Sequence, residues 1–385
     1  MNDLPDKLQR KLDDRSASNA LRKLGTQNGL VDFSSNDYLG FSKSEALFEA
    51  THHYLTENHF TQNGATGSRL LSGNHPLYAV LETMLSKFHD SEDALVFNSG
   101  YDANLGFFSC VPQRGDLIFY DEYSHASIRD GITMSNAKSY KFKHNDLDAL
   151  KKQVLRHSEL ASKSKQTTYI VTESVFSMDG DTPDLRAFAD FCTRNNCHLI
   201  VDEAHAIGVF GERGSGLVQE LKMEQQPFAR IATFGKAMGC HGAAILGSSS
   251  LKQYLINFSR SFIYTTALSP HALATIKSSY SELLKTSKIQ KLHQNISFFK
   301  TEVQRLQLER LFISSNSSIH CCVVSGNETI KNIAKQLKDN GFDVKPILSP
   351  TVPKGQERLR FCLHSYNSEK EISEVLTLLS TFVQK

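Results

Sequence analysis

The chain contains no apolar run that approaches the length needed to cross a membrane, which is about 18 to 20 residues. It also lacks a strong charge of either sign, since its formal net charge at pH 7 is only +2. Its basic runs, such as KSKQ and KLHQ, are short and scattered, as is typical of solvated helix faces. The sequence therefore predicts no membrane segment and no nucleic-acid partner.

Cysteines are few and show no paired spacing of the kind that binds metals. There are seven, an odd number, and packing explains Cys192 and Cys197 at the end of a predicted helix better than zinc binding does. This usage fits a reducing compartment. The first residues, MNDLPDKLQRKLDDR, lack the apolar region of a signal peptide. We therefore expect a cytoplasmic location and no metal site.

Two common nucleotide-binding motifs are also missing. The sequence has neither the GxGxxG fingerprint of dinucleotide-binding domains nor a GxxxxGK[ST] phosphate loop. A nicotinamide-dependent dehydrogenase would suit an α/β chain of this length, but the missing fingerprint counts against it.

Short β-branched and aromatic segments alternate with helical patterns from about residue 75 onward. The predicted strands are ALVFN (94–98), DLIFY (116–120), TTYIVTE (167–173), CHLIVD (197–202), RIATF (230–234) and GAAILG (242–247). Such alternation predicts an α/β fold, with a mostly parallel central sheet flanked by helices.

The two ends of the chain follow other patterns. Residues 4–24 predict an amphipathic helix with Leu4, Leu8 and Leu12 on one stripe, followed by a short strand and a turn. After about residue 270, a long helical stretch leads into strands and helices typical of a smaller α+β domain. We therefore expect an N-terminal segment over 1–45, a large α/β domain over 46–270 and a small C-terminal domain over 271–385.

Polar side chains follow several of the predicted strands, where ligands bind in open α/β sheets. Ser99 follows ALVFN, Glu173 and Ser177 follow TYIVT, Asp202 and His205 follow HLIV, and Lys236 follows IATF. One such residue means little, but several together predict a single site.

Each of these residues has an ordinary explanation beside the functional one. NSG at 98–100 suits a turn, but free N–H groups at a helix start also bind phosphate. Asp202 suits an ion pair or a helix cap, but also a carboxylate facing a cationic ring nitrogen. Lys236, between glycines in an apolar stretch, suits a surface loop or an amine nucleophile. His125 suits a local hydrogen bond at a helix start.

The order of these motifs resembles that of fold-type I enzymes dependent on pyridoxal 5'-phosphate (PLP), and more narrowly the α-oxoamine synthases. The matching segments run in family order over nearly the whole chain: NALRKL, FSSNDYLG, GATGSRLLSGN, FNSGYDAN, YSHASIRDG, TESVFSMDGD, VDEAHAIGVFG, TFGKAMG, FIYTTALSP, SPTVPKG and ERLRFCL. The fold that this resemblance implies is a fold-type I PLP-dependent transferase.

The resemblance also implies a role for each matching residue. Lys236 would bond the cofactor and move the substrate Cα proton, and Asp202 would keep the pyridine nitrogen protonated. His205 and Ser177 would bond the ring hydroxyl, and His125 would stack on the ring. The implied phosphate contacts are Ser99, Gly100, Tyr101 and Thr233, with Thr265 and Thr266 reaching the neighbouring subunit of a homodimer that shares its active sites. The implied substrate contacts are Arg360 for the amino-acid carboxylate, and Arg22 and Thr351 for the acyl chain.

Within the family, the chain is most similar to the branch that joins L-alanine to a pimeloyl thioester in biotin biosynthesis. An Arg22 contact would suit the anionic far end of that acyl chain. Bacterial serine palmitoyltransferase is the alternative, because its motifs overlap and the amino-acid pocket is not readable from one sequence. A non-catalytic scaffold on the same fold predicts loss of Lys236 or Asp202, and both are present.

Overall fold

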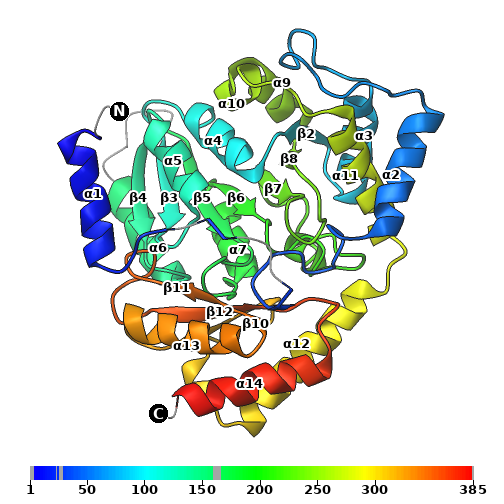
Figure 1. Cartoon of the computed structure of the whole chain (residues 1–385). Coiled ribbons are helices and arrows are strands. Elements are labelled where there is room, and N and C mark those ends of the chain that lie inside the picture. The colour runs from blue at the N-terminus through cyan, green and yellow to red at the C-terminus, as the bar shows by residue number, and fades with distance from the viewer. Residues whose placement is uncertain (1–3, 23, 26–28, 159–165, 384–385) are drawn as a thin grey trace. The chain divides into compact units, whose positions relative to one another are not determined.

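The computed structural model describes residues 4–22, 24–25, 29–158 and 166–383 and divides into two compact units. The large unit comprises Asn36–Ser177 and Asp181–His293. The small unit comprises Met1–Ser35, Met178–Gly180 and Gln294–Lys385. Figure 1 shows the elements of both units, each of which is described by itself below.

A seven-stranded sheet forms the centre of the large unit. Its strand order is β2-β8-β7-β6-β5-β3-β4, and all its strands are parallel except β8, which is antiparallel to both neighbours. The strands are β2 (Asp93–Phe97), β3 (Leu117–Asp121), β4 (Lys138–Phe142), β5 (Thr168–Glu173), β6 (His198–Asp202), β7 (Ala229–Thr233) and β8 (Ala243–Gly247). The predicted mostly parallel sheet is confirmed.

Helices flank this sheet, as predicted. They are α2 (Glu45–Glu57), α3 (Leu77–Phe88), α4 (Gly100–Cys110), α5 (Ala126–Met134), α6 (Leu147–Ser158), α7 (Leu185–Arg194), α8 (Leu217–Glu220), α9 (Ser249–Phe258), α10 (Arg260–Ile263) and α11 (Pro270–Leu283). Helix α12 (Lys288–Arg305) crosses the division between the units at Gln294.

A buried cluster ties one face of the sheet to α4, α5 and α9. The strands contribute Leu95, Ile118, Val171, Ile200, Ile231 and Ile245, and the helices contribute Phe107, Phe108, Ile128, Ile132, Leu251 and Leu255. Each such side chain stabilises the fold by about 1.5 to 3 kcal/mol when fully buried. The packed sheet is therefore a rigid support for the loops at its edge.

The small unit has the α+β composition that the sequence predicts. Its three-stranded antiparallel sheet has the order β11-β12-β9, and β1 pairs with β10 in parallel. Its strands are β1 (Val31–Asp32), β9 (Ile319–Val323), β10 (Phe342–Asp343), β11 (Lys345–Ile347) and β12 (Arg358–Cys362). Its helices are α1 (Asp6–Ala17), α13 (Asn327–Asp339), α14 (Glu369–Val383) and a 3-10 turn at Glu309–Leu311.

The predicted boundaries at residues 45 and 270 differ from this division in two places. Residues up to Ser35 group with the C-terminal residues because β1 pairs with β10. Helix α11 groups with the large unit because its buried Tyr280 packs on Phe88 and Phe234. Both differences come from contacts that are distant in sequence.

Two local predictions differ from the structure. The helix predicted over 4–24 is only α1, and its stripe of Leu4, Leu8 and Leu12 is 44 to 47% exposed. Strand β4 was not predicted, because KSYKF lacks an apolar run. It lies at the edge of the sheet and pairs only with β3, so Lys138 and Lys141 can remain exposed.

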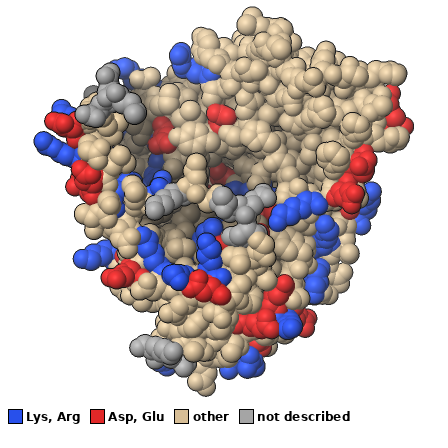
Figure 2. Space-filling view, viewed as in Figure 1, with Lys and Arg blue, Asp and Glu red and all other residues tan. Residues whose placement is uncertain are grey.

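None of the described helices is both long enough and apolar enough to span a bilayer. On the face of the molecule shown in Figure 2, Lys and Arg side chains are interspersed with Asp and Glu side chains.

Candidate active site

A cavity of about 230 Å³ lies in the large unit where the parallel strands end. Glu173, Asp202 and Thr233 are the last residues of β5, β6 and β7, and Asp202 is the register partner of Glu173 on the adjacent strand. Of the residues predicted for the site, eight line this cavity: Ser99, Gly100, Tyr101, His125, Glu173, Asp202, Thr233 and Lys236.

The start of α4 forms one wall of the cavity. Ser99 caps the helix, since its Oγ accepts a hydrogen bond from the Asp102 N–H at 3.1 Å. Gly100 follows, and a Cβ at this position would lie 2.5 Å from Thr233 Cγ2. Only glycine lets β7 approach the helix start so closely. The N–H groups of Gly100 and Tyr101 at the helix start therefore border a narrow wall that suits a phosphate.

Tyr101 stands at the rim of the same wall and is 45% exposed. Its hydroxyl donates a short hydrogen bond to Asp130 Oδ2, and this bond raises the pKa of Tyr101. The phenol is therefore held in its neutral form.

Asp202 is buried in the floor of the cavity, with only 5% of its surface exposed. Its Oδ1 accepts a hydrogen bond from the Ala204 N–H at 2.9 Å, and its Oδ2 accepts one from Asn104 Nδ2 at 2.8 Å. A buried carboxylate with two donors is fixed in place and is suited to a cationic partner in the cavity.

His125 faces the cavity from the N-terminus of α5, where its Nδ1 accepts a hydrogen bond from the Ser127 N–H at 3.2 Å. The residue is exposed to the cavity, yet the surrounding walls desolvate its ring. This desolvation lowers the pKa of His125, and Lys236 and Arg129 lower it further against the opposite effect of Asp202. The neutral imidazole is thereby favoured.

Glu173 lines the same cavity and is 3% exposed. Its Oε1 accepts a hydrogen bond from the His125 backbone N–H at 2.6 Å. Burial, and then the neighbouring charge of Asp202, raise the pKa of Glu173 well above its ordinary value. Two carboxyl groups on adjacent strands thus differ in character, because Asp202 has donors on both oxygens and Glu173 is pushed toward its protonated form.

Lys236 reaches the cavity from the connection between β7 and β8. This connection is closed by hydrogen bonds from the Phe234 N–H to the Gly242 carbonyl at 2.9 Å and from the Gly239 N–H to the Lys236 carbonyl at 2.8 Å. Lys236 is half-buried, and Phe234, Ala237 and Met238 around it are buried. The apolar setting that the sequence indicated is therefore present.

The other predicted cofactor residues do not line the described cavity. His205 is buried, and its Nδ1 lies 2.7 Å from the hydroxyl of Tyr38. Ser177 is half-buried near the end of the segment that follows β5. Thr265 and Thr266 lie on the segment before α11, where Asn98 Nδ2 donates to Thr265 Oγ1 at 2.9 Å and to the Thr266 carbonyl at 2.8 Å.

The three predicted substrate residues belong to the small unit. Arg360 is buried in β12, opposite Lys345 on one side and Cys321 on the other. Arg22 and Thr351 are exposed, and the Thr351 N–H donates to the Leu348 carbonyl at 2.8 Å.

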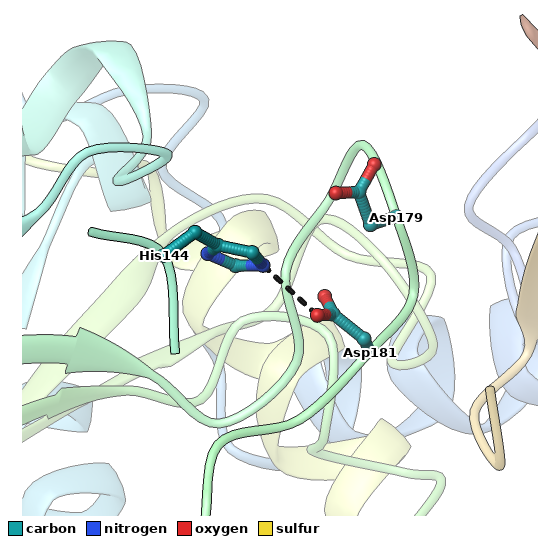
Figure 3. A group of neighbouring side chains, drawn as sticks. All are labelled: His144, Asp179 and Asp181. Carbon is teal, nitrogen blue, oxygen red and sulfur yellow. Dashed lines mark hydrogen bonds and ion pairs between the residues drawn. The ribbon is translucent and has the colours of Figure 1, made fainter. Parts of the chain in front are cut away.

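A second polar cluster in the large unit supports the segment that carries His125. His144 donates to Asp121 from Nδ1 at 2.8 Å and to Asp181 from Nε2 at 2.9 Å, the second contact being drawn in Figure 3. Asp121 also accepts the Tyr123 N–H at 2.8 Å. Burial alone would lower the pKa of His144, but the two aspartates raise it to about 9.

Sequence reasoning missed four polar residues that line the cavity: Asn36, Asn104, Ser127 and His241. Asn104 lies one helical turn after Gly100, so the same face of α4 presents both. The NSGYDAN spacing carried that signal, but a buried Asn within a helix is not distinctive without the position of its neighbours.

The comparisons with known proteins agree with this geometry. The family described as "Aminotransferase class I and II" matches residues 28–379, which is nearly the whole chain. The chain belongs to the aminotransferase class I and II family. One curated relative of this chain is 8-amino-7-oxononanoate synthase from Emericella nidulans. It is 41% identical over 376 residues, which cover 92% of this chain and 90% of that protein.

Solved structures of aminotransferase class I and II relatives extend the comparison. The crystal structure of 8-amino-7-oxononanoate synthase from Francisella tularensis is 30% identical, with a TM-score of 0.76 and coverage of 93% of this chain and 99% of that one. A serine palmitoyltransferase from S. paucimobilis, solved with a bound aldimine of PLP and myriocin, is 24% identical and shares the fold with a TM-score of 0.87, covering 98% of this chain and 97% of that one. The resemblance to the α-oxoamine synthases is therefore confirmed.

Proposed function

We propose that this enzyme condenses L-alanine with a pimeloyl thioester, using PLP, to give 8-amino-7-oxononanoate in biotin biosynthesis. Carbon dioxide from the alanine carboxylate and the free thiol are the other products. The observation that carries this proposal is the meeting, in one cavity, of an amine, a buried carboxylate, an imidazole and a helix N-terminus. The names of the relatives at 41% and 30% identity support the choice of reaction.

The residues around the cavity fit PLP. The start of α4 and Thr233 offer hydrogen-bond donors for a phosphate on one narrow wall of the cavity. They can lie so close together because Gly100 has no side chain. Asp202 offers a buried carboxylate for a protonated ring nitrogen, and Lys236 offers a primary amine for the aldehyde carbon. When bound, PLP supplies an electron-accepting ring that stabilises negative charge at the amino-acid Cα.

The residues of the chain would bind and orient the cofactor and the substrate, and would move protons. Asp202 would hold the proton on the ring nitrogen, and the desolvated cavity would strengthen this pair. The Lys236 Nζ would bond the cofactor and would also carry the alanine Cα proton. The His125 ring would, from the family resemblance, stack on the cofactor ring and orient it. From the family resemblance, Ser177 and His205 are proposed to bond the ring hydroxyl.

Substrate recognition is proposed for residues of the small unit. The Arg360 guanidinium would bind the alanine carboxylate with its planar fork. Arg22 would bind the distal carboxylate of the pimeloyl chain, with Thr351 contacting the acyl group.

Assembly as a homodimer is part of the proposal. Thr265 and Thr266, held by Asn98, would reach the phosphate bound by the neighbouring subunit. A cytoplasmic location is also part of the proposal, and the pimeloyl group would be carried by coenzyme A or by acyl-carrier protein.

Serine palmitoyltransferase stays the second candidate because its motifs overlap with those of this chain. The likeness to the S. paucimobilis enzyme, at 24% identity, supports the fold alone. Thiol release would be measured with alanine, serine and glycine against pimeloyl and palmitoyl thioesters. We expect the highest kcat/KM for alanine with the pimeloyl donor. The highest value for serine with the palmitoyl donor would overturn this assignment.

Arg22→Ala tests the choice of acyl chain. It should reduce the preference for pimeloyl over palmitoyl thioester, because the distal carboxylate loses its cation. Arg10→Ala, a change of the same kind at an exposed position of α1, is the matched control and should leave the preference unaltered. An unchanged preference in Arg22→Ala would remove Arg22 from the acyl site.

A further inference from the structure

A chain of hydrogen bonds connects His125 to Asp202 through two residues to which no role has been given. Ser127 Oγ lies 2.7 Å from His125 Nδ1, and Asn104 Nδ2 lies 3.1 Å from that Oγ. The same Asn104 nitrogen lies 2.8 Å from Asp202 Oδ2. Asn104 and Ser127 are each 1% exposed, so water has little access to these two side chains.

The direction of each bond follows from the chemistry of its ends. The Ser127 backbone N–H can only donate, and it donates to His125 Nδ1 at 3.2 Å. Nδ1 is therefore the lone-pair nitrogen, and the Ser127 hydroxyl must donate to it as well. That hydroxyl in turn accepts one hydrogen of the Asn104 amide, while the carboxylate of Asp202 accepts the other.

This arrangement is compatible with only one state of the His125 ring. A neutral imidazole with its proton on Nε2 accepts both Ser127 donors, whereas an imidazolium would turn an Nδ1–H toward them. The charged groups that act on the ring are Asp202, Lys236, Arg129 and Asp130, and the Glu173 carboxyl binds the His125 backbone N–H.

We propose that Asn104 and Ser127 are positioning residues that hold His125 as the neutral Nε2–H tautomer and fix the orientation of the Asp202 side chain. The inference rests on the proposed function, because it concerns the face and the nitrogen partner of the same cofactor. An imidazolium stacked on a protonated pyridine ring would repel it, and a neutral imidazole does not. The Asn104 amide donates to Asp202 Oδ2 and so fixes the position of the side chain that would face the ring nitrogen.

The first test uses the protein without cofactor, so that it does not depend on the reaction. Histidines labelled with ¹⁵N would be followed by NMR against pH, and His125→Asn would identify the His125 signals by their loss. The wild-type ring should be the Nε2–H tautomer at neutral pH. Finding the Nδ1–H tautomer, or an imidazolium, at neutral pH would overturn the proposal without any further variant.

The second test removes the links one at a time. Ser127→Ala should raise the pKa of His125 relative to wild type and weaken PLP binding roughly fivefold, as for one lost hydrogen bond. Ser127→Thr retains the hydroxyl and should keep both the pKa of His125 and the affinity for PLP near their wild-type values. Ser124→Ala is the matched control, because the buried Ser124 Oγ has no hydrogen-bond partner among the described residues and lies on the same segment. Equal effects of Ser124→Ala and Ser127→Ala would contradict the proposal.

The third test asks whether the two residues act as one unit. Asn104→Ala should also raise the pKa of His125 and weaken PLP binding, and the double variant should be little worse than either single variant. Independent losses that add would show that no chain connects Asp202 to His125. Failure of the substrate assays, with the predicted NMR behaviour intact, would refute the proposed reaction and leave this inference standing.

Discussion

Replacing Gly100 by alanine is the sharpest test of the proposed phosphate site, which is formed by the start of α4 and Thr233. The added Cβ would lie 2.5 Å from Thr233 Cγ2, whereas ordinary van der Waals contact begins at 3.4 Å, so the two groups would overlap by about 0.9 Å. Both groups belong to well-packed parts of the large unit, at the first residue of α4 and the last residue of β7. Neither the helix nor the strand can move away without disturbing the core.

Overpacking of this kind costs about 1 to 3 kcal/mol. If this free-energy cost destabilises the conformation that binds PLP, the affinity for PLP should drop roughly fivefold to a hundredfold. Gly100→Ala/Thr233→Ser should recover much of this loss, because serine keeps the hydroxyl and lacks the methyl group that collides. Gly64→Ala is the control, since a Cβ there meets no atom within 4 Å.

The assay is titration of the cofactor-free protein with PLP, followed by absorbance, for the wild type and these variants. Wild-type affinity in Gly100→Ala would refute the reasoning. So would a double variant as weak as the single one, because the collision with Thr233 would then not be the cause.

Two further predictions concern charge. Asp202→Asn should retain the shape of the site but slow exchange of the amino-acid Cα proton by orders of magnitude, since each 1.4 kcal/mol of lost stabilisation costs about tenfold in rate. Exchange would be measured by NMR, and a near-normal rate would limit Asp202 to a structural role. The free energy of unfolding, measured with urea at a series of pH values, should be greatest near pH 6.5. Burial lowers the pKa of His89 from 6.5 to about 3, so its contribution is lost as the pH falls through that range. Burial alone would lower the pKa of His144, but Asp121 and Asp181 raise it from 6.5 to about 9. The contribution of His144 to the free energy of unfolding, about 3 kcal/mol, is therefore lost as the pH rises through that range. His144→Gln should abolish this loss of stability at alkaline pH.

The strand-end residues could be predicted because the geometry of a parallel sheet is simple. The carboxyl ends of β5, β6 and β7 lie at one edge, so polar residues that follow apolar strands must lie close together. Asp202 and Lys236 were identified in this way and Thr233 by the family resemblance, and all three line the cavity.

Residues that lie inside helices could not be identified by the same reasoning. Asn104 and Ser127 face the cavity only because α4 and α5 are rotated so that these positions point away from solvent, and that rotation depends on core packing. The roles of Glu173 and Asp202 differ for a similar reason. Both are acidic residues at the end of a strand, and only their hydrogen-bond donors distinguish them.

The divisions of the chain were the least predictable feature. Strand β1 has two residues, and its pairing with β10 joins positions about 310 residues apart, as in the register pair Val31 and Phe342. No local pattern carries such a contact. Edge strand β4 was missed because its side chains are mostly polar, which a strand with one neighbour permits.

The most direct test of the central claim is covalent capture of the cofactor on Lys236. The purified protein would be incubated with PLP, its absorbance recorded, and the complex reduced with borohydride and digested. We predict a yellow protein and a single cofactor-labelled peptide that contains Lys236, with no label in Lys236→Ala. A protein that stays colourless, or a label that lies on another lysine while Lys236 is unmodified, would contradict the account.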